Sequence, residues 1–146
     1  MELTAVDNPR GVRYPLGRIL TTHHWFGSTM SDSPAPLPLD IDVRSVKQLL
    51  DAGENDFLLL DCREPSEHAT AHIAAAKLIP MKTIPAQLAM LEPHRQGRIV
   101  VHCHHGGRSA RVVHWLRQQG FAGAQNMTGG IDAWSLEVDS SVPRYK

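Results

Sequence analysis

The sequence predicts an α/β fold in which a parallel sheet of about five strands carries helices on both faces. Short apolar runs alternate with segments whose apolar residues recur at helical spacing, and this alternation is typical of such a sheet. The clearest strand–helix unit spans residues 99–119, where an apolar run leads through a loop into a helical pattern. Ligands bind at the carboxyl ends of strands in folds of this kind, so we expect the functional site in that loop.

The other elements follow in chain order. A strand is expected over residues 39–43, before a helix that opens on the capping-box pair Ser45 and Gln48 and ends at Gly53. The continuous apolar run at 57–60 indicates a strand covered on both faces. The remaining expected elements are a brief strand at 78–79, an amphipathic helix at 84–91 with Pro85 near its start, a strand at 99–101, a helix stopped by Gly120, a strand at 123–127 and a short helix at 130–136.

Length and composition restrict the class of protein. The 146 residues suit one domain, and 42% apolar and 21% charged residues are ordinary for a globular chain. Fifteen basic residues balance fifteen acidic ones, so no overall field attracts nucleic acid or an anionic membrane. No apolar run approaches the roughly 20 residues that span a bilayer, and no signal-peptide core opens the chain. Two cysteines without an export signal favour a reducing compartment, so we expect a cytoplasmic protein without a structural disulfide.

The first part of the chain carries little pattern of either period. We expect residues 1–39 to form an N-terminal extension that is disordered or only partly ordered, and residues 40–146 to form the domain. The stretch 27–38 is rich in Ser, Pro and Gly, as linkers are. Met30 would make an ordinary start, so a second hypothesis is that residues 1–29 do not belong to the native protein.

The loop after residue 101 contains the pattern Cys-x-x-Gly-x-Arg-Ser, from Cys103 to Ser109. It leads into a helix N-terminus, whose unpaired amides and positive dipole end favour an anion. Gly106 and Gly107 allow successive amides to turn inward, and Arg108 adds a fixed positive charge. These neighbours lower the pKa of a thiol, so Cys103 is predicted to be a sulfur nucleophile.

These residues and two further motifs resemble a single-domain rhodanese, a family of sulfurtransferases that carry sulfur as a cysteine persulfide. The resemblance covers roughly residues 40–146. The motifs are Cys103-His104-His105-Gly106-Gly107-Arg108-Ser109, Asp61-Cys62-Arg63-Glu64-Pro65 with Glu67-His68 and Ala71-His72-Ile73, and Gly129-Gly130-Ile131-Asp132-Ala133-Trp134.

The resemblance implies the rhodanese fold and ping-pong transfer of a sulfane sulfur. The donor is an anion such as thiosulfate, and the acceptor is cyanide, a thiol or a sulfur-carrier protein. It implies no cofactor and no metal. Cys103 is then the catalytic residue, and the predicted substrate-binding residues are Arg63, His104, His105, Gly106, Gly107, Arg108 and Ser109.

Asp61 and Arg63 follow the apolar strand at 57–60 and are expected on the same rim as Cys103. As a functional residue, Arg63 either helps to hold an anionic donor or supports the loop. The alternative interpretation is a surface arginine paired with Glu64 or Glu67. Asp61 is expected to give structural support, because a general base there would repel a thiolate. His72 is expected to make a structural hydrogen bond.

Cys62 is most simply a small buried apolar residue. It is a resolving thiol for Cys103 only if the two strands that carry them are neighbours. His102, His104 and His105 around Cys103 suggest zinc or copper, but consecutive residues point in different directions and lack the spacing of zinc sites.

Three other functions remain open. The first is a cysteine phosphatase or arsenate reductase, although the loops of those enzymes are one residue longer between cysteine and arginine. The second is a non-catalytic interaction or sensor module, and the third a metal chaperone.

The sequence departs from the family pattern at Ala71, where glycine is common, and at His68, where tyrosine is common. The tail with Pro143, Arg144 and Tyr145 resembles rhodanese domains fused to adenylating enzymes, which implies a ubiquitin-like sulfur-carrier protein as a partner.

Overall fold

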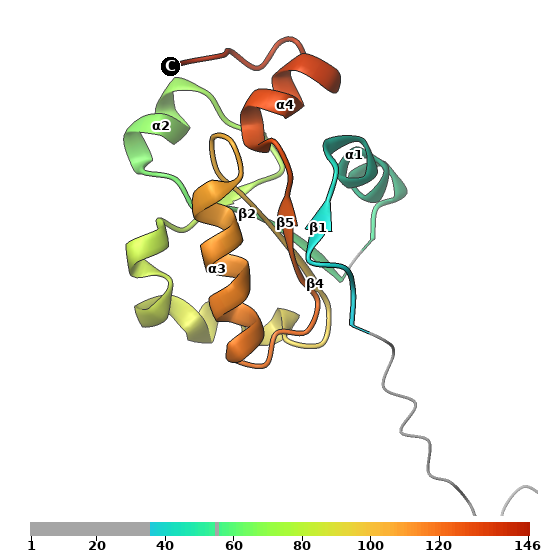
Figure 1. The fold of residues 1–146 in the computed structure, drawn as a ribbon, viewed down its shortest axis with the longest axis vertical. Helices are drawn as coiled ribbons and strands as arrows, with labels where there is room; N and C mark the ends of the chain where they lie inside the picture. Colours follow the sequence, from blue (N-terminus) through green and yellow to red (C-terminus); the bar gives the residue numbers. More distant parts are fainter. Residues whose placement is uncertain (1–35, 55) are drawn as a thin grey trace, which may run out of the picture. The chain divides into compact units, whose positions relative to one another are not determined.

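A computed structural model describes residues 36–54 and 56–146, which form a parallel sheet covered by helices on both faces (Figure 1). The predicted α/β fold class is therefore confirmed. The order of the strands is β1-β5-β4-β2-β3, and every neighbouring pair is parallel. Of the extension expected over residues 1–39, residues 1–35 lie outside the described residues, and so does the question whether residues 1–29 are native. The strands are β1 (Asp40–Ile41), β2 (Phe57–Asp61), β3 (Lys77–Leu78), β4 (Arg98–His102) and β5 (Ala124–Met127).

Among the described residues, four α-helices and three short 3₁₀ helices accompany the strands, and the last of them follows β5. None of the described helices is long and apolar enough to cross a membrane. The helices are α1 (Val43–Ala52), α2 (Pro65–Thr70), η1 (Met81–Thr83), η2 (Pro85–Met90), η3 (Glu92–His94), α3 (Gly107–Gln118) and α4 (Gly130–Glu137).

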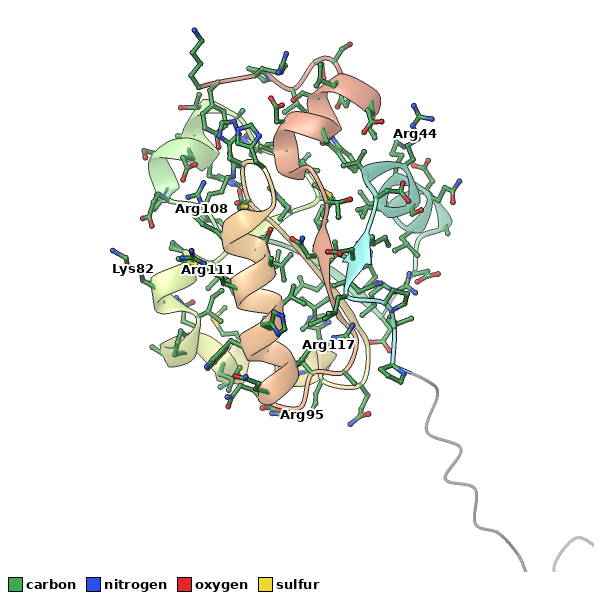
Figure 2. All side chains as sticks on the ribbon, in the orientation of Figure 1. Arg44, Lys82, Arg95, Arg108, Arg111 and Arg117 are labelled. Atoms are coloured by element: carbon green, nitrogen blue, oxygen red, sulfur yellow. The ribbon has the colours of Figure 1, made fainter. Side chains whose placement is uncertain are left out.

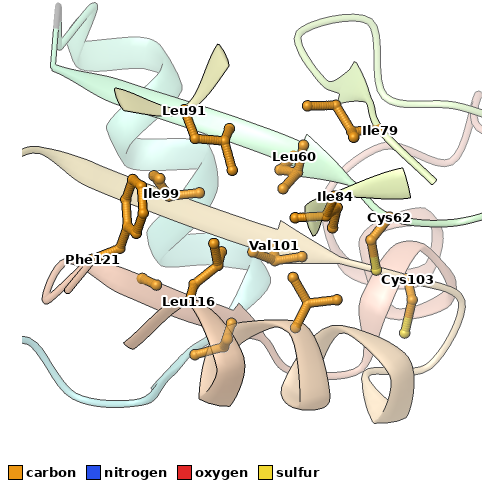
Figure 3. Packing of buried hydrophobic residues seen from close by; sticks show 13 residues of the cluster. Leu60, Cys62, Ile79, Ile84, Leu91, Ile99, Val101, Cys103, Leu116 and Phe121 are labelled. Atoms are coloured by element: carbon orange, nitrogen blue, oxygen red, sulfur yellow. The ribbon is translucent and has the colours of Figure 1, made fainter. Parts of the chain in front are cut away.

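The sheet separates two hydrophobic clusters. Leu60 and Val101 face α3 and the 3₁₀ segment, while Leu59 and Val100 face α1 and α4. All four side chains are at most 1% exposed, as expected for central strands covered on both faces. Figure 3 shows the first cluster, which extends along β2 and β4 to two cysteines at their carboxyl ends.

The first helix begins earlier than the sequence analysis predicted. Asp42 is its N-cap, because the carboxylate accepts hydrogen bonds from the Ser45 amide at 2.9 Å and the Ser45 hydroxyl at 2.7 Å. The predicted capping box of Ser45 with Gln48 is wrong, because Ser45 lies inside the helix. Its own amide donates to the carboxylate of Asp42, which is the N-cap. The helix ends as predicted at Gly53, whose φ is 64°.

The predicted helix at 84–91 is also wrong. This stretch forms 3₁₀ turns, and Gln87 leaves helical geometry within η2. Pro93 of η3 lacks the amide that a continuous α-helix would use at that point, whereas Pro85 lies in the first turn of η2, where no amide is needed. The sequence analysis also missed α2, although Glu64 and Glu67 form a capping box around Pro65 at its start.

The strand order places the functional loop at the centre of the sheet. The chain leaves β2 toward β3 on one side and leaves β4 toward β5 on the other. A crevice opens at the carboxyl ends of strands where the connections diverge in this way. The residues after β2 and β4 therefore meet at this crevice.

Candidate functional site

Cys103 follows directly after β4, and its loop is fixed from behind by the start of α4. The amide of Ile131 donates to the Cys103 carbonyl at 2.9 Å, and the amide of Asp132 donates to the His104 carbonyl at 3.1 Å. Gly130 allows this close approach, because a Cβ at that position would collide with the His104 carbonyl oxygen. The motif near the end of the domain thus holds the loop that carries the thiol.

The sulfur of Cys103 lies at the N-terminus of α3. The Gly106 amide donates to Sγ at 3.1 Å, and the φ of Gly106 is 110°, which favours glycine at this turn into α3. Burial raises the pKa of the thiol, but hydrogen bonds from the Ser109 hydroxyl and from the amides of Ser109, Gly106 and Arg108 outweigh it. The pKa of Cys103 therefore lies below the ordinary value of a thiol, and a thiolate is favoured here.

The Ser109 hydroxyl connects the sulfur to β5. Its oxygen lies 3.3 Å from Cys103 Sγ and 2.6 Å from Asn126 Oδ1. The Asn126 amide nitrogen in turn donates to Asp40 at 3.1 Å, which orients Oδ1 toward Ser109. Because a hydroxyl has one hydrogen, Ser109 donates either to Asn126 or to the sulfur, and the shorter contact is the one to Asn126.

Cys103 is buried and exposes only 2% of its surface, whereas a nucleophile must be accessible to its substrate. The next two residues lie nearer the solvent, with His104 half-buried and His105 exposed. A donor therefore reaches the sulfur only when side chains around the loop move aside. The amides of Gly106, Arg108 and Ser109 act on the sulfur in this conformation, but the sulfur itself is covered.

Arg108 faces away from the sulfur, toward α2. Its guanidinium makes two hydrogen bonds to the Glu67 carboxylate, at 2.8 and 2.7 Å. The Arg108 guanidinium lowers the pKa of Glu67 to about 2, and Glu67 raises the pKa of Arg108. In Figure 2, Arg108 lies on the same side of the domain as the exposed basic residues Lys82 and Arg111.

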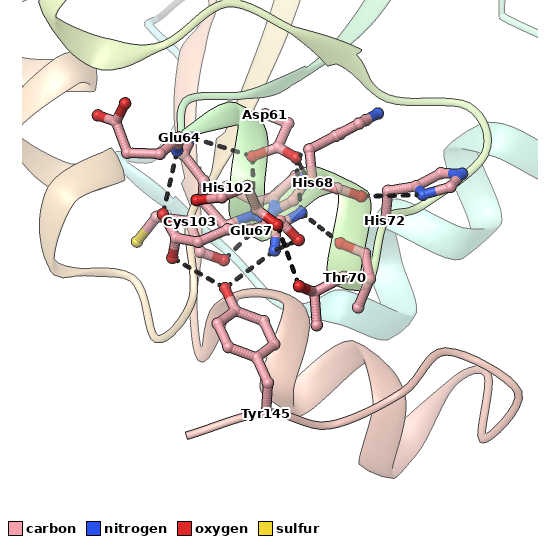
Figure 4. A network of polar contacts seen from close by, with 12 residues as sticks. Asp61, Glu64, Glu67, His68, Thr70, His72, His102, Cys103 and Tyr145 are labelled. Atoms are coloured by element: carbon pink, nitrogen blue, oxygen red, sulfur yellow. Dashed lines mark hydrogen bonds and ion pairs between the residues drawn. The ribbon is translucent and has the colours of Figure 1, made fainter.

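Arg63 is buried, with an exposed fraction of 0%. Figure 4 shows the network of polar contacts around Asp61, Glu67 and Tyr145, all three of which lie within hydrogen-bond distance of Arg63. Its guanidinium donates to both oxygens of Asp61 at 2.9 and 2.7 Å and to the Ala71 carbonyl at 2.7 Å. Burial would raise the pKa of Asp61, but the hydrogen bond from Arg63 and the contacts with His102 and His68 lower it to about 2.

The predicted contact between Arg63 and a substrate is not favoured by this geometry, because the side chain has no surface and its donors already have partners. The alternative surface pair with a glutamate carboxylate is wrong as well, since Arg63 pairs with buried Asp61. The contacts of Arg63 instead hold the Ala71 carbonyl and the Tyr145 hydroxyl, and Tyr145 in turn stacks on His104 of the loop, so any support of the loop is indirect.

Tyr145 joins the tail of the chain to this network. Its hydroxyl lies 2.9 Å from Arg63 Nη1 and 3.0 Å from Glu67 Oε1. Its ring stacks on His104, with centroids 4.0 Å apart and planes 10° apart. The tail therefore contacts α2, the Asp61–Arg63 pair and the functional loop together.

The remaining predicted histidines are spread around the site. His102 is fully buried, and burial lowers its pKa to about 4, so the ring is neutral at pH 7. His72 is exposed, with Nδ1 3.1 Å from the His68 carbonyl oxygen. Across residues 36–54 and 56–146, no three His, Cys, Asp or Glu side chains are placed to hold a metal ion.

Three residues that shape the site were not singled out as site residues from the sequence: Glu67, Asn126 and Tyr145. A signal existed for Asn126, because a polar residue inside a strand whose four residues are all buried needs a partner. Glu67 and Tyr145 gave no such signal, since each lies far along the chain from Cys103.

Comparisons with known proteins agree with this geometry. The family model described as Rhodanese-like domain matches residues 42–137. The Sulfurtransferase of Allochromatium vinosum is 38% identical over 96 residues, which is 66% of this chain and 87% of that protein. A crystal structure of a rhodanese-like domain protein from Staphylococcus aureus superposes with a TM-score of 0.62 at 31% identity, covering 75% of this chain and 100% of that one.

A longer relative is the Adenylyltransferase and sulfurtransferase MOCS3-1 of Zea mays. It is 38% identical over 129 residues, which is 81% of this chain but 27% of that protein. The chain spans less than a third of the length of the first curated relatives that it matches.

Proposed function

Because the chain belongs to the Rhodanese-like domain family, we propose that it is a sulfurtransferase that carries a sulfane sulfur as a persulfide on Cys103. One observation supports this most directly. The sulfur of Cys103 lies at the N-terminus of α3, where the Gly106 amide donates to it at 3.1 Å and the neighbouring amides lower the pKa of the thiol.

In the first half of the reaction, the Cys103 thiolate attacks the outer sulfur of a donor such as thiosulfate. A bond forms between the two sulfurs, the S–S bond of the donor breaks, and sulfite leaves with the bonding electron pair. In this proposal the amides of residues 104–109 hold the negative charge of the terminal sulfur, and the hydrogen bonds of Gly106, Arg108 and Ser109 to the thiol support this. The amides do so without reorganising, which is the property that stabilises charge in a catalytic site.

In the second half, a nucleophilic acceptor such as cyanide or a thiol takes the outer sulfur. The persulfide bond breaks and its electron pair returns to Cys103, which is again a thiolate. His104 and His105 form the outer part of the loop and are the side chains that an incoming acceptor meets first.

The two arginines have different roles in this proposal. In this proposal Arg63 supports the loop indirectly, through Tyr145 and its stack on His104, and does not touch the substrate. Arg108 contributes its backbone amide to the sulfur, and its guanidinium reaches an anionic donor only by leaving Glu67. Exposed Lys82 and Arg111 attract an anionic donor to the same side of the domain.

A ubiquitin-like sulfur-carrier protein is the macromolecular acceptor that we propose. Support comes from the relative named Adenylyltransferase and sulfurtransferase in Zea mays and from the similar tail of this chain. A transfer assay that follows labelled sulfur onto such a carrier tests this part of the proposal.

The main experiment is an intact mass spectrum before and after incubation with thiosulfate. We expect the wild-type protein to gain one sulfur atom and to lose it to cyanide, with one thiocyanate formed for each sulfur lost. The Cys103→Ser variant should gain no sulfur while its circular dichroism spectrum stays native. Sulfur addition to the variant would refute the assignment of Cys103. Hydrolysis of an aryl phosphate without sulfur addition would instead show a phosphatase.

A further inference from the structure

The two cysteines of this chain lie next to each other at the carboxyl ends of neighbouring strands. β2 and β4 are directly paired, with Asp61 opposite His102, so the next residues, Cys62 and Cys103, are opposite each other too. The Cys62 amide continues the pairing by donating to the His102 carbonyl at 3.1 Å. Sequence alone left open whether these strands are neighbours, and the sheet order answers that question.

Both side chains point to the same face of the sheet. Residues opposite each other in parallel strands share a face, and both cysteines belong to the hydrophobic cluster under α3 (Figure 3). Neighbouring strands lie about 4.8 Å apart. The Cα atoms of a disulfide are usually about 4.4–6.8 Å apart, so the spacing of paired strands meets this condition for a disulfide.

The burial of Cys62 keeps dissolved reagents away from its thiol and leaves Cys103 as its reactive neighbour. Cys62 is 1% exposed, and its backbone is held on both sides, by His102 and by the Met81 amide that donates to its carbonyl at 2.9 Å. The described part of the chain offers it one reactive neighbour, the thiol of Cys103.

We propose that Cys62 is a resolving thiol that discharges the Cys103 persulfide when no acceptor arrives. This inference rests on the proposed function, because it needs the persulfide. The Cys62 sulfur attacks Sγ of Cys103, and the bond between Sγ and the outer sulfur breaks. The outer sulfur, which carries a negative charge in the persulfide, leaves with the electron pair of that bond and takes up the proton of the Cys62 thiol. The products are a Cys62–Cys103 disulfide and hydrosulfide, so atoms, charge and electrons balance without an external oxidant. A dithiol reductant then restores both thiols.

The chemistry of Cys62 makes this step slow. Burial, together with the negative charges of Cys103 and Asp61, raises the pKa of Cys62 to about 12. A thiol of this kind stays protonated and is a weak nucleophile at neutral pH. When an acceptor is present, it therefore takes the sulfur first. Cys62 reacts only with a persulfide that has met no acceptor.

The test follows the loaded protein over time. Wild-type protein is loaded with thiosulfate, separated from it, and kept without acceptor in the absence of oxygen. We expect its mass to fall from one added sulfur to two hydrogens below that of the reduced protein, with one equivalent of sulfide released. A non-reducing digest should contain the peptides of Cys62 and Cys103 joined together. The rate should not depend on protein concentration, because the step is intramolecular.

The matched variants are Cys62→Ala and Cys62→Val, of which the second keeps the apolar volume if the first folds poorly. Both should stay loaded and release no sulfide over the time in which wild-type protein is discharged. Loaded wild-type protein that lasts as long as these variants would overturn the inference and leave the proposed function intact.

A second arm separates the inference from the proposed function. If thiosulfate does not load wild-type protein, the proposed function fails, and hydrogen peroxide is used as the probe instead. Peroxide converts Cys103 to a sulfenic acid, and attack by Cys62 then releases water and forms the same disulfide. The joined peptides in this arm support the resolving role of Cys62, and their absence refutes it.

Discussion

The guanidinium of Arg108 forms a two-pronged ion pair with the carboxylate of Glu67, at 2.8 and 2.7 Å. This pair joins the first turn of α3 to α2, and the Tyr145 hydroxyl contacts the same carboxylate. The arginine that the sequence places beside the reactive sulfur is therefore held by a residue 41 positions away. The positive charge that Arg108 offers to an anionic substrate therefore depends on whether Glu67 or the substrate binds its guanidinium.

Replacing Glu67 tests that competition. Glu67→Gln removes the negative partner of Arg108, so we expect the KM for thiosulfate to fall. The pair is partly exposed, and such pairs contribute at most about 1 kcal/mol, so the free energy of unfolding should drop by about that amount. Steady-state kinetics and urea denaturation measure both effects. Glu137→Gln, which alters an exposed carboxylate beside Arg44, is the control. An unchanged KM and an unchanged stability would contradict the role given to the pair.

Ser109→Ala tests the hydroxyl next to the sulfur. A hydrogen bond to a charged acceptor contributes about 1.5–3 kcal/mol. Because the Ser109 hydroxyl also contacts Asn126, we expect the substitution to remove only part of this free energy. The pKa of Cys103 should then rise by about one. The pH dependence of alkylation by iodoacetamide measures this pKa. The exposed Ser66→Ala variant should give the wild-type profile. A Ser109→Ala profile that matches wild type would show that the amides alone stabilise the thiolate.

Tyr145 is predicted to control access to the covered sulfur. Tyr145→Phe keeps the stack on His104 but loses the contacts with Arg63 and Glu67, while Tyr145→Ala loses both. We expect Cys103 to be alkylated fastest in Tyr145→Ala, with Tyr145→Phe between it and wild type. The rates are compared at a pH where the thiol is fully ionised, so that access alone is measured. Equal rates in all three proteins would show that the tail does not cover the path to the sulfur.

Acid should destabilise the fold through two carboxylates. The pKa of Glu67 is lowered from 4.5 to about 2 and that of Asp61 from 3.8 to about 2. Since both carboxylates bind protons more weakly in the folded state, their stabilisation is complete above about pH 4.5 and is lost as the pH falls toward 2. Urea denaturation across this range should show stability falling with pH, and falling less steeply in Glu67→Gln. A stability that stays constant from pH 4.5 to 2.5 would contradict this prediction.

Arg63→Ala should be the most destabilising of the substitutions considered. It leaves the buried Asp61 carboxylate without its cation, and loss of one partner from a buried pair costs about 3–5 kcal/mol. We expect the free energy of unfolding to fall clearly, and the loop around Cys103 to be held less firmly. Arg95→Ala, which breaks an exposed pair with Glu92, is the matched control. A variant as stable as wild type would show that Arg63 does not support the loop as proposed.

The parts of this protein that depend on nearby residues could be predicted from the sequence. Strand and helix periodicity predicted the parallel sheet, and the run from Cys103 to Ser109 predicted a thiol at a helix N-terminus, because an amide cradle is built from consecutive residues. The same local signals failed at residues 84–91, which form 3₁₀ turns. Gln87 leaves helical geometry there, and Pro93 just beyond cannot continue an α-helix.

Only the tertiary structure decided which distant groups meet. The pairing of Arg108 with Glu67, the burial of Arg63 against Asp61, the stacking of Tyr145 on His104 and the juxtaposition of the two cysteines all join separate elements. An arginine in a motif has the same donors whichever carboxylate is near, so the motif does not reveal its partner. That partner is set by the strand order and the way helices pack on the sheet, and these in turn determine which charges and thiols act at the site.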